Sequence, residues 1–424
     1  MKIEIPYGQK DRLMVTVDDH RVLGRIHPNP TAPVDERAVL EKALGQPIGS
    51  PPLDQFLRGA EDVIILVNDA TRPTPTARVL ETIVPLLGNT PFRFMVAAGS
   101  HRGPTEKEFR QIFGGMYERF RDRIEVHQAR HREGLEVIGT TSRGTEMAVN
   151  RRVLQADRIV VIGSVEPHYF AGFTGGRKSF LPGVAAFETI EQNHSLALHR
   201  AAHTLALEGN PVHEDMMEAV APLLERQVFA VQAIVNQEGR IQGVTAGHLR
   251  DCFPPATEKS RQVFVVPVPE KADVVVTVAP FPTDINLYQS QKALENGKLA
   301  LKEDGILIVV SACRDGIGDD TFARLLSESA SPRDALEKMQ QGYRLGYHKA
   351  AKIAEICLWA HIWALTELSD AQLEPLFIRP VHDLQSALNE AFEIRGADAR
   401  VLFLMEGSLT VPCPCDLSAE TQSA

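Results

Sequence analysis

Short apolar runs rich in β-branched residues alternate along the chain with segments of helical periodicity. The runs that predict buried strands span residues 63–67, 92–96, 158–163, 227–235, 272–279, 305–310 and 401–405. Helical patterns follow residue 104 and cover residues 187–207, 289–300 and 350–363. Strands that alternate with helices in this way are typical of βαβ units. The pattern therefore predicts an α/β fold with mainly parallel sheets.

The same pattern predicts two α/β domains with the active site in the cleft between them. Residues 1–264 are expected to form the first domain, and the proline-rich segment 266–270 is typical of a connector. Residues 271–398 are expected to form a second domain that closes over the substrate. The strand in the C-terminal segment, residues 399–424, could close either sheet, and we expect this segment to return to the N-terminal domain. Its last residues, 418–424, are predicted to be disordered.

Polar residues follow three predicted strands of the first domain, at the point where each strand ends. These residues are Asp69 and Arg72 after the first strand, His101 after the second, and His168 and Lys178 after the third. Open α/β sheets bind ligands at the carboxyl ends of their strands. We therefore expect these side chains to form one site at one edge of the sheet.

The third of these loops is rich in glycine and contains Gly175-Gly-Arg-Lys178. Glycine lacks a Cβ, so Gly175 and Gly176 are expected to let the backbone approach a ligand closely. The segment is only a weak match to a phosphate-binding Walker loop, because Arg177 stands where that loop requires its second glycine. A lysine beside Arg177 has its ammonium form disfavoured, which is one route to a nucleophilic amine.

Each of these signals has a simpler structural explanation. Asp69 could cap a turn, most histidines lie on the surface, and Lys178 could be a solvated cation in the first turn of a helix. Arg72 is more telling, because its guanidinium matches a carboxylate with two hydrogen bonds. In the second domain, Gln289 and Lys292 are three residues apart and share one face of a predicted helix. They would bind an anion if they faced the first domain.

The composition narrows the range of functions. The chain has 424 residues and a net charge of −10, which argues against binding to nucleic acid. No apolar run is long enough to span a bilayer, and the N-terminus has no signal-like apolar core. Five scattered cysteines do not form a disulfide framework, and the Cys413-Pro-Cys415 pair lacks partners for a metal site. We expect a soluble cytoplasmic protein with no nucleic-acid or membrane partner.

Taken together, these residues resemble the nickel-pincer lactate racemase family. The matching pieces occur in the family's order and comprise Asp69-Ala-Thr-Arg-Pro73, Gly99-Ser-His-Arg102, Glu166-Pro-His168, Gly175-Gly-Arg-Lys178, Asn193-His194, Tyr288-Gln-x-x-Lys292 and Gly346-x-His-Lys349. No single piece would be sufficient, but their joint specificity is high. The resemblance covers residues 60–350 and implies a racemase or epimerase that inverts C2 of a 2-hydroxy acid.

The resemblance also implies a cofactor, a nickel pincer built on pyridinium-3,5-bisthiocarboxylic acid mononucleotide. Lys178 would bind it covalently through a thioamide, and His194 would complete the nickel coordination, which soft sulfur and imidazole ligands favour. Asp69, Arg72, Gly175 and Gly176 would contact the cofactor, with Asp69 orienting either Arg72 or the cofactor. Proteins that make and insert this cofactor are the implied partners.

The same resemblance assigns the remaining roles. His101 and His168 would be the two acid/base groups, because hydride that returns to the opposite face of a keto acid leaves the hydroxyl on the other side. Arg72, Gln289 and Lys292 would hold the substrate carboxylate, and Tyr288 would line the substrate pocket. Two alternatives stay open: a hydrolase or lyase with zinc or iron on His101, His168 and His194, and a non-catalytic protein that binds small anions.

Overall fold

The computed structural model describes residues 1–415, which divide into two compact units. The central unit runs from Pro30 to Val263. The terminal unit combines Met1–Asn29 with the chain from Phe264 onward. The start of the chain therefore does not belong with the central unit, contrary to the expected first domain of residues 1–264. A strand pairing described below explains this difference.

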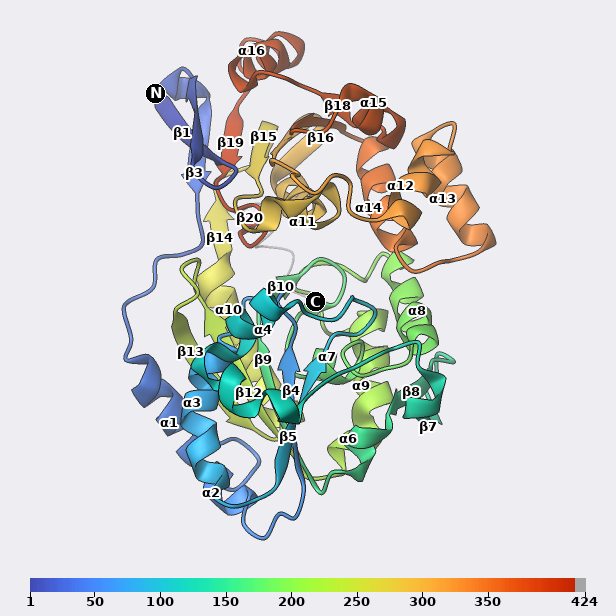
Figure 1. Cartoon of the computed structure of the whole chain (residues 1–424). Coiled ribbons are helices and arrows are strands. Elements are labelled where there is room, and N and C mark those ends of the chain that lie inside the picture. Colours follow the sequence, from blue (N-terminus) through green and yellow to red (C-terminus); the bar gives the residue numbers. More distant parts are fainter. Residues whose placement is uncertain (416–424) are drawn as a thin grey trace. The chain divides into compact units, whose positions relative to one another are not determined.

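The central unit is built on a six-stranded sheet whose strand order is β13-β12-β9-β4-β5-β6 (Figure 1). Its strands are β4 (Val63–Asn68), β5 (Phe92–Ala97), β6 (Ile124–Val126), β9 (Arg158–Ser164), β12 (Val228–Val235) and β13 (Ile241–Gly247). All neighbours pair in parallel except β12 and β13, which are antiparallel. The expected strands of the first domain are confirmed, and the order places β9, β4 and β5 side by side.

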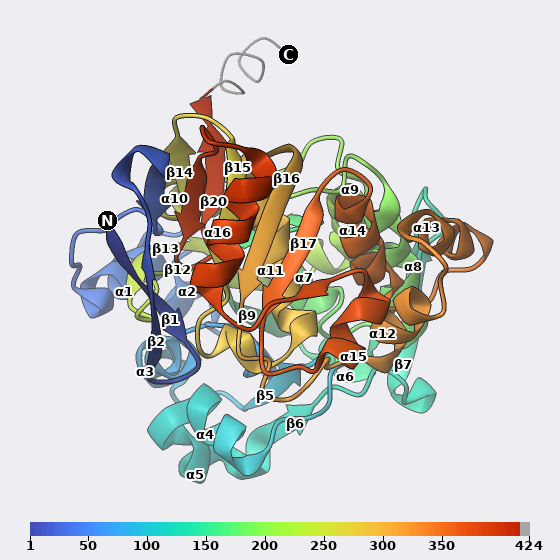
Figure 2. The same ribbon diagram turned by 90° about the horizontal axis from the view of Figure 1, so that it is seen from above.

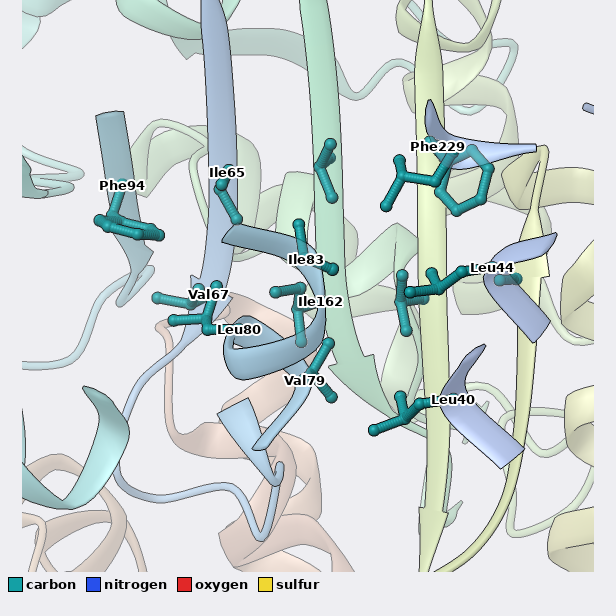
Figure 3. Packing of buried hydrophobic residues seen from close by; sticks show 14 of the residues in the cluster. Leu40, Leu44, Ile65, Val67, Val79, Leu80, Ile83, Phe94, Ile162 and Phe229 are labelled. Carbon is teal, nitrogen blue, oxygen red and sulfur yellow. The ribbon is translucent and has the colours of Figure 1, made fainter. Parts of the chain in front are cut away.

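Helices cover this sheet and bury its apolar side chains. Figure 3 shows residues from α1 (Glu36–Gly45) and α3 (Thr76–Leu87) packed against side chains from the strands. The cluster includes Leu40, Leu44, Val79, Leu80, Ile83, Ile65, Phe94, Ile162 and Phe229, all 3% exposed or less. Because successive residues such as Ile64 and Ile65 point to opposite faces and are both buried, the sheet is covered on both faces, as parallel sheets are. This packing gives the strand-end loops a rigid base.

Shorter elements of the central unit carry the loops of interest. The helices are α2 (Leu53–Phe56), α4 (Glu106–Phe113), α5 (Tyr117–Phe120), α6 (Arg151–Gln155), α7 (Arg177–Phe180), α8 (Phe187–Ser195), α9 (Pro211–Leu224) and α10 (Leu249–Phe264). The hairpin strands are β7 (Leu135–Thr140) with β8 (Glu146–Asn150), and β10 (Pro167–His168) with β11 (Gly172–Phe173). Helix α4 begins with the expected capping box, in which Thr105 and Glu108 bond each other's backbone N–H.

The terminal unit contains a second six-stranded sheet, in the order β18-β17-β16-β15-β19-β3, with every pair parallel. Its strands are β3 (Val22–Ile26), β15 (Ala272–Val278), β16 (Leu301–Val310), β17 (His361–Leu365), β18 (Arg379–Pro380) and β19 (Val401–Leu404). Figure 2 shows β15, β16 and β17 side by side in this sheet. The other elements are β1 (Lys2–Tyr7), β2 (Asp11–Thr16), α11 (Leu287–Gly297), α12 (Asp320–Ser327), α13 (Pro332–Gln341), α14 (Tyr347–Cys357), α15 (Asp370–Leu373) and α16 (Leu384–Arg395).

Three local predictions are wrong in the terminal unit. Strand β19 pairs with β15 on one side and with β3 on the other, so the C-terminal segment lies in this sheet and brings the N-terminal strand with it. The expected connector 266–270 begins instead as β14 (Val265–Val268), which pairs with β20 (Val411–Pro414). The expected helix over residues 350–363 ends at Cys357, and Trp363 lies in β17.

Within residues 1–415, no helix is both long and apolar enough to cross a membrane. The predicted disorder of residues 418–424 concerns positions outside the described residues. The described chain contains five free cysteines, among them Cys413 and Cys415.

Candidate active site

Three loops of the central unit start at the same edge of its sheet. Strands β9, β4 and β5 are neighbours and run in parallel, so their carboxyl ends point the same way. The loop after β4 carries Asp69 and Arg72, the loop after β5 carries His101, and the loop after β9 carries His168 and Lys178. The predicted clustering at one sheet edge is therefore confirmed for these loops.

Asp69 holds His101. Its carboxylate lies 2.7 Å from His101 Nδ1 and accepts hydrogen bonds from the backbone N–H and the hydroxyl of Thr71. Burial acts to raise the pKa of Asp69, but the bonds from His101 and Thr71 and the charge of Arg72 outweigh it and lower the pKa to about 2. The carboxylate keeps the His101 proton on Nδ1, which directs the lone pair of Nε2 away from Asp69. The imidazole itself is 47% exposed and so is open to a ligand.

Arg72 faces a second buried carboxylate, that of Glu166. The guanidinium Nη1 of Arg72 lies 3.9 Å from Glu166 Oε1, and the other oxygen of Glu166 is buried without a hydrogen-bond partner. An ion pair at this distance is loose, and the Arg72 side chain is 23% exposed. Its guanidinium therefore keeps hydrogen-bond donors for an anionic ligand. The sequence had pointed to Glu166 only as part of a motif, with no role of its own.

His168 and Lys178 are in direct contact. His168 Nε2 lies 3.0 Å from Lys178 Nζ, and both side chains are at most 7% exposed. Phe170 packs edge-on against the His168 ring at 4.5 Å between centroids, and its own ring lies 5.2 Å from Lys178 Nζ. The hairpin β10–β11 and helix α7 thus bring a histidine and a lysine together in a largely apolar environment. Ammonium is poorly solvated in such an environment.

His194 lies in α8 and packs edge-on against the Phe170 ring, 5.1 Å between centroids. Burial is the largest cause that lowers the pKa of His194 to about 3, and the Arg72 guanidinium acts in the same direction. The imidazole is therefore neutral at physiological pH, which is the form that binds metals. Arg72, His101 and Lys178 all lie within electrostatic range of His194, so the three strand-end loops share one environment.

A buried network fixes the helix that carries His194. Asp215 is fully buried and accepts hydrogen bonds from Thr141, Thr145 and Asn193, at 2.6, 2.9 and 2.8 Å. Asn193 precedes His194 directly, so the carboxylate on α9 anchors α8 next to His194. The sequence contained no signal for Asp215, because it lies far from the glycine-rich loop and its neighbours carry no motif.

The two glycines of the loop have a packing explanation. A Cβ on Gly175, whose φ is +123°, would lie 2.7 Å from the Phe253 ring, and one on Gly176 would lie 2.6 Å from Leu249. Protein atoms therefore fill the space that a side chain would need, and close approach to a ligand is not what requires glycine here. Contact of these two residues with the cofactor stays a prediction.

The donor set restricts how a metal could be held. Across residues 1–415, no three His, Cys, Asp or Glu side chains converge to hold a metal ion on their own. This disfavours a hydrolase or lyase in which His101, His168 and His194 are the ligands, since the three side chains do not converge and His168 Nε2 contacts Lys178. A neutral His194 near a buried Lys178 instead fits a metal whose other ligands come from a group bound to the lysine.

The predicted residues of the terminal unit lie on α11. Tyr288 is partly buried, and burial together with the charge of Asp319 raises its pKa. Lys349 on α14 donates to the Tyr288 carbonyl at 2.5 Å and sits over the Tyr288 ring at 3.8 Å. Gln289 and Lys292 are also partly buried, and Gln289 lies in the first turn of the helix, where Asn286 caps its N–H. Their part in substrate binding stays a prediction.

Comparisons with known proteins agree with this geometry. The family described as the lactate racemase N-terminal domain matches residues 7–205, and the lactate racemase C-terminal domain matches residues 268–411. A lactate racemase from Thermoanaerobacterium thermosaccharolyticum is 30% identical over 421 residues, which cover 96% of this chain and 97% of that protein. The chain belongs to the lactate racemase family. It is accordingly an enzyme, an isomerase of the racemase type.

Two further family comparisons support this assignment. A lactate racemase from Lactiplantibacillus plantarum is 27% identical over 419 residues, covering 96% of this chain and 98% of that protein. The solved structure of the lactate racemase apoprotein from T. thermosaccharolyticum matches with a TM-score of 0.90 at 30% identity, over 97% of this chain and 100% of that chain. A Thermotoga maritima protein has the same fold, with a TM-score of 0.70 at 18% identity, over 91% of this chain and 100% of that one.

Proposed function

We propose that this family member interconverts the two enantiomers of lactate or of a closely related 2-hydroxy acid. The proposal rests on two histidines that differ in their surroundings. His101 is exposed and bound to a carboxylate, whereas His168 is buried and touches Lys178. Inversion at C2 needs two acid/base groups, one for each face of the substrate. The relatives named lactate racemases support lactate as the substrate class.

The nickel-pincer mononucleotide implied by the resemblance would supply a carbon centre that accepts and returns the C2 hydrogen as hydride. Lys178 would hold this group through its side-chain nitrogen, and His194 would be the protein ligand of the nickel. Two features support this assignment: the lysine is buried beside a histidine, and the pKa of His194 is lowered to about 3, mainly by burial. An imidazole that stays neutral is ready to bind a metal without first losing a proton.

Arg72 would bind the substrate carboxylate. Its loose ion pair with Glu166, at 3.9 Å, leaves the planar guanidinium able to form two parallel bonds with a carboxylate. Glu166 would hold Arg72 in place from the far side. Anchoring through the carboxylate allows the rest of the substrate to turn while the molecule stays bound, which inversion requires. Tyr288, Gln289 and Lys292 would add further contacts to the substrate.

His101 and His168 would exchange the hydroxyl proton of the substrate. The Asp69 carboxylate would hold the ring of His101 through Nδ1 and keep its Nε2 available for the reacting oxygen. His168 contacts the lysine side chain through Nε2 and accepts from the Ala171 N–H at Nδ1. Each direction of the reaction would use one histidine as base and the other as acid. Both histidines would therefore be required in both directions.

Racemisation itself tests the proposal. The protein is produced together with the proteins that make the cofactor and is incubated separately with L-lactate and D-lactate. A series of larger 2-hydroxy acids follows. We expect each pure enantiomer to yield the other, as followed by chiral chromatography, and a protein that only binds anions would bind these acids without turnover. A hydrolase or lyase would release products of different mass.

A further inference from the structure

Arg177, in the glycine-rich loop, is buried and does not face a ligand. It is 1% exposed, and its guanidinium donates to the carbonyls of Ala171, Phe173 and Thr174 at 2.9, 2.8 and 2.9 Å. The guanidinium carbon lies 4.4 Å from the centre of the Phe253 ring. Arg177 ties the hairpin β10–β11 to the start of α7.

The charge of Arg177 is not neutralised by an acid. No carboxylate in the described part of the chain lies within ion-pair distance of its guanidinium, and burial lowers its pKa to about 9. Three carbonyl dipoles and an aromatic face hold the cation. A buried arginine without a carboxylate partner is rare in proteins. A buried arginine at this position indicates that the conformation of the hairpin β10–β11 must be fixed.

One of the three residues that Arg177 bonds, Ala171, also contacts His168 through its N–H. The Ala171 carbonyl accepts from Arg177, and the Ala171 N–H donates to His168 Nδ1 at 3.4 Å. A backbone N–H can only donate, so His168 Nδ1 must present its lone pair. In a neutral imidazole the single proton is then on Nε2.

The tautomer of His168 determines the protonation state of Lys178. His168 Nε2 lies 3.0 Å from Lys178 Nζ. If Nε2 carries the proton, it donates to Nζ, and a nitrogen that accepts a hydrogen bond must have a lone pair. Lys178 is then a neutral amine. An ammonium group in the same place would need His168 to carry its proton on Nδ1, against the N–H of Ala171.

We propose that Arg177 is a positioning residue for the lysine. By bonding the Ala171 carbonyl, Arg177 fixes the position of this residue, whose own N–H then keeps His168 in the Nε2–H tautomer. Lys178 is thereby presented as a neutral, nucleophilic amine before any cofactor is bound. His168 thus has a second task, which is to prepare the lysine for covalent loading. The inference rests on the proposed function only in taking Lys178 as the attachment point, and its test needs neither cofactor nor turnover.

The test is trace acetylation of the chain produced without the cofactor-making proteins. Acetic anhydride reacts only with neutral amines: the nitrogen attacks a carbonyl carbon, acetate leaves and the amine proton goes to the buffer. Labelling of Lys178 is followed by peptide mass spectrometry over a series of pH values, with the exposed Lys107 as internal reference. The half-labelling pH reports protonation independently of accessibility, which changes only the maximal rate.

We expect Lys178 in the unaltered chain to reach half-labelling at least about one pH unit below Lys107. Arg177→Met and His168→Phe should each move this midpoint up towards that of Lys107. Arg177→Lys keeps the positive charge but loses the forked guanidinium. Its Lys178 midpoint should fall between those of the unaltered chain and of Arg177→Met. Circular dichroism first shows whether each variant folds like the unaltered chain. If Arg177→Met does not fold, the proposal is tested with Arg177→Lys and His168→Phe.

Arg261 provides the matched control. It also lies over the same hairpin, with its guanidinium 5.1 Å from the Phe173 ring, but donates to Leu205 rather than to the lysine loop. Arg261→Met should leave the Lys178 midpoint unchanged. The proposal is overturned if Lys178 and Lys107 titrate together in the unaltered chain, if Arg177→Met labels like the unaltered chain, or if Arg261→Met shifts the midpoint equally. Lactate racemisation can succeed or fail independently of all three results.

Discussion

The two six-stranded sheets end in loops of very different chemistry. In the central unit, the loops after β4, β5 and β9 carry Asp69, His101 and Lys178. Asp69 is bonded to His101, and Lys178 contacts a second histidine, His168. In the terminal unit, the loops after β15 and β16 carry Asp284 and Arg314, which form an ion pair at 3.1 Å. Both units use the same sheet architecture, but the polar groups at the two sheet edges have different roles.

The polar groups at the edge of the terminal sheet mostly bond one another. The hydroxyls of Ser290 and Ser311 lie 2.7 Å apart, and the Cys313 thiol contacts Ser311 at 3.4 Å. The backbone N–H of Cys313 donates to the Asp284 carbonyl and joins the two loops. Such a network stiffens the start of α11, which carries the predicted substrate contacts. It leaves few groups for acid/base chemistry.

The edge of the central sheet instead keeps groups whose pKa values differ strongly from those in water. Burial lowers the pKa of His194 to about 3 and that of Arg177 to about 9. Such perturbed groups gather at functional sites because catalysis needs them. A parallel sheet edge therefore indicates where a site can be, and the protonation states of its residues distinguish a reactive edge from a stabilising one.

The largest expected effect comes from removing the central lysine. Lys178→Ala should abolish cofactor attachment and reduce racemisation below detection, because the ligand would lose its only covalent bond to the chain. Intact-mass measurement of protein produced with the cofactor-making proteins checks this. A mass increment that survives in Lys178→Ala would move the attachment elsewhere.

Single histidine changes should come next. His101→Gln and His168→Gln should each lower kcat by about 10²–10⁴-fold in both directions, since each direction uses both residues. The rates from L- and D-lactate are measured separately, with the intact mass as control for loading. Near-normal rates in either variant would remove the two-histidine scheme.

The Asp69–His101 pair should also be visible in stability. The pKa of Asp69 lies at about 2, below its ordinary value of 3.8, so its carboxylate stabilises the fold above about pH 4 and this contribution is lost as pH falls through about 2. Asp69→Asn should therefore lower the free energy of unfolding by about 2 kcal/mol at neutral pH and by less in acid. Urea unfolding at several pH values measures this, and a difference that does not shrink in acid would contradict the assignment.

A change at the edge of the terminal sheet should affect stability without affecting loading. Arg314→Met leaves the buried Asp284 carboxylate without its ion pair, and we expect a loss of about 1–2 kcal/mol, reduced because Arg314 is partly exposed. The Lys178 mass increment should be unchanged. Loss of the increment in a folded Arg314→Met protein would mean that the two edges do not differ as argued.

The sequence was informative wherever local signals were sufficient. Apolar runs predicted the central strands, and the polar residues that follow β4, β5 and β9 predicted one shared edge, because neighbouring parallel strands end together. The capping box at Thr105 is equally local, and the structure contains it. These features depend on residues that lie close together in the chain.

Long-range partners could not be predicted. The pairing of β3 with β19 joins residues nearly 400 positions apart, and no local sequence pattern predicts it. The apolar run around Trp363 suits a helix or a strand equally, and neighbouring β16 selected the strand. In the site, Asp69 was expected to orient Arg72 or the cofactor, whereas its carboxylate bonds His101 and Thr71. Nor did the sequence indicate that Arg177 bonds carbonyls of its own loop.

The central claim is that the chain, once loaded, inverts C2 of a 2-hydroxy acid. The most direct measurement follows pure L-lactate and pure D-lactate by chiral chromatography, with a sample whose intact mass shows the adduct on Lys178. The account predicts that both reactions approach the same equal mixture of enantiomers. A fully loaded sample that leaves both lactate enantiomers and the larger 2-hydroxy acids unchanged would contradict it.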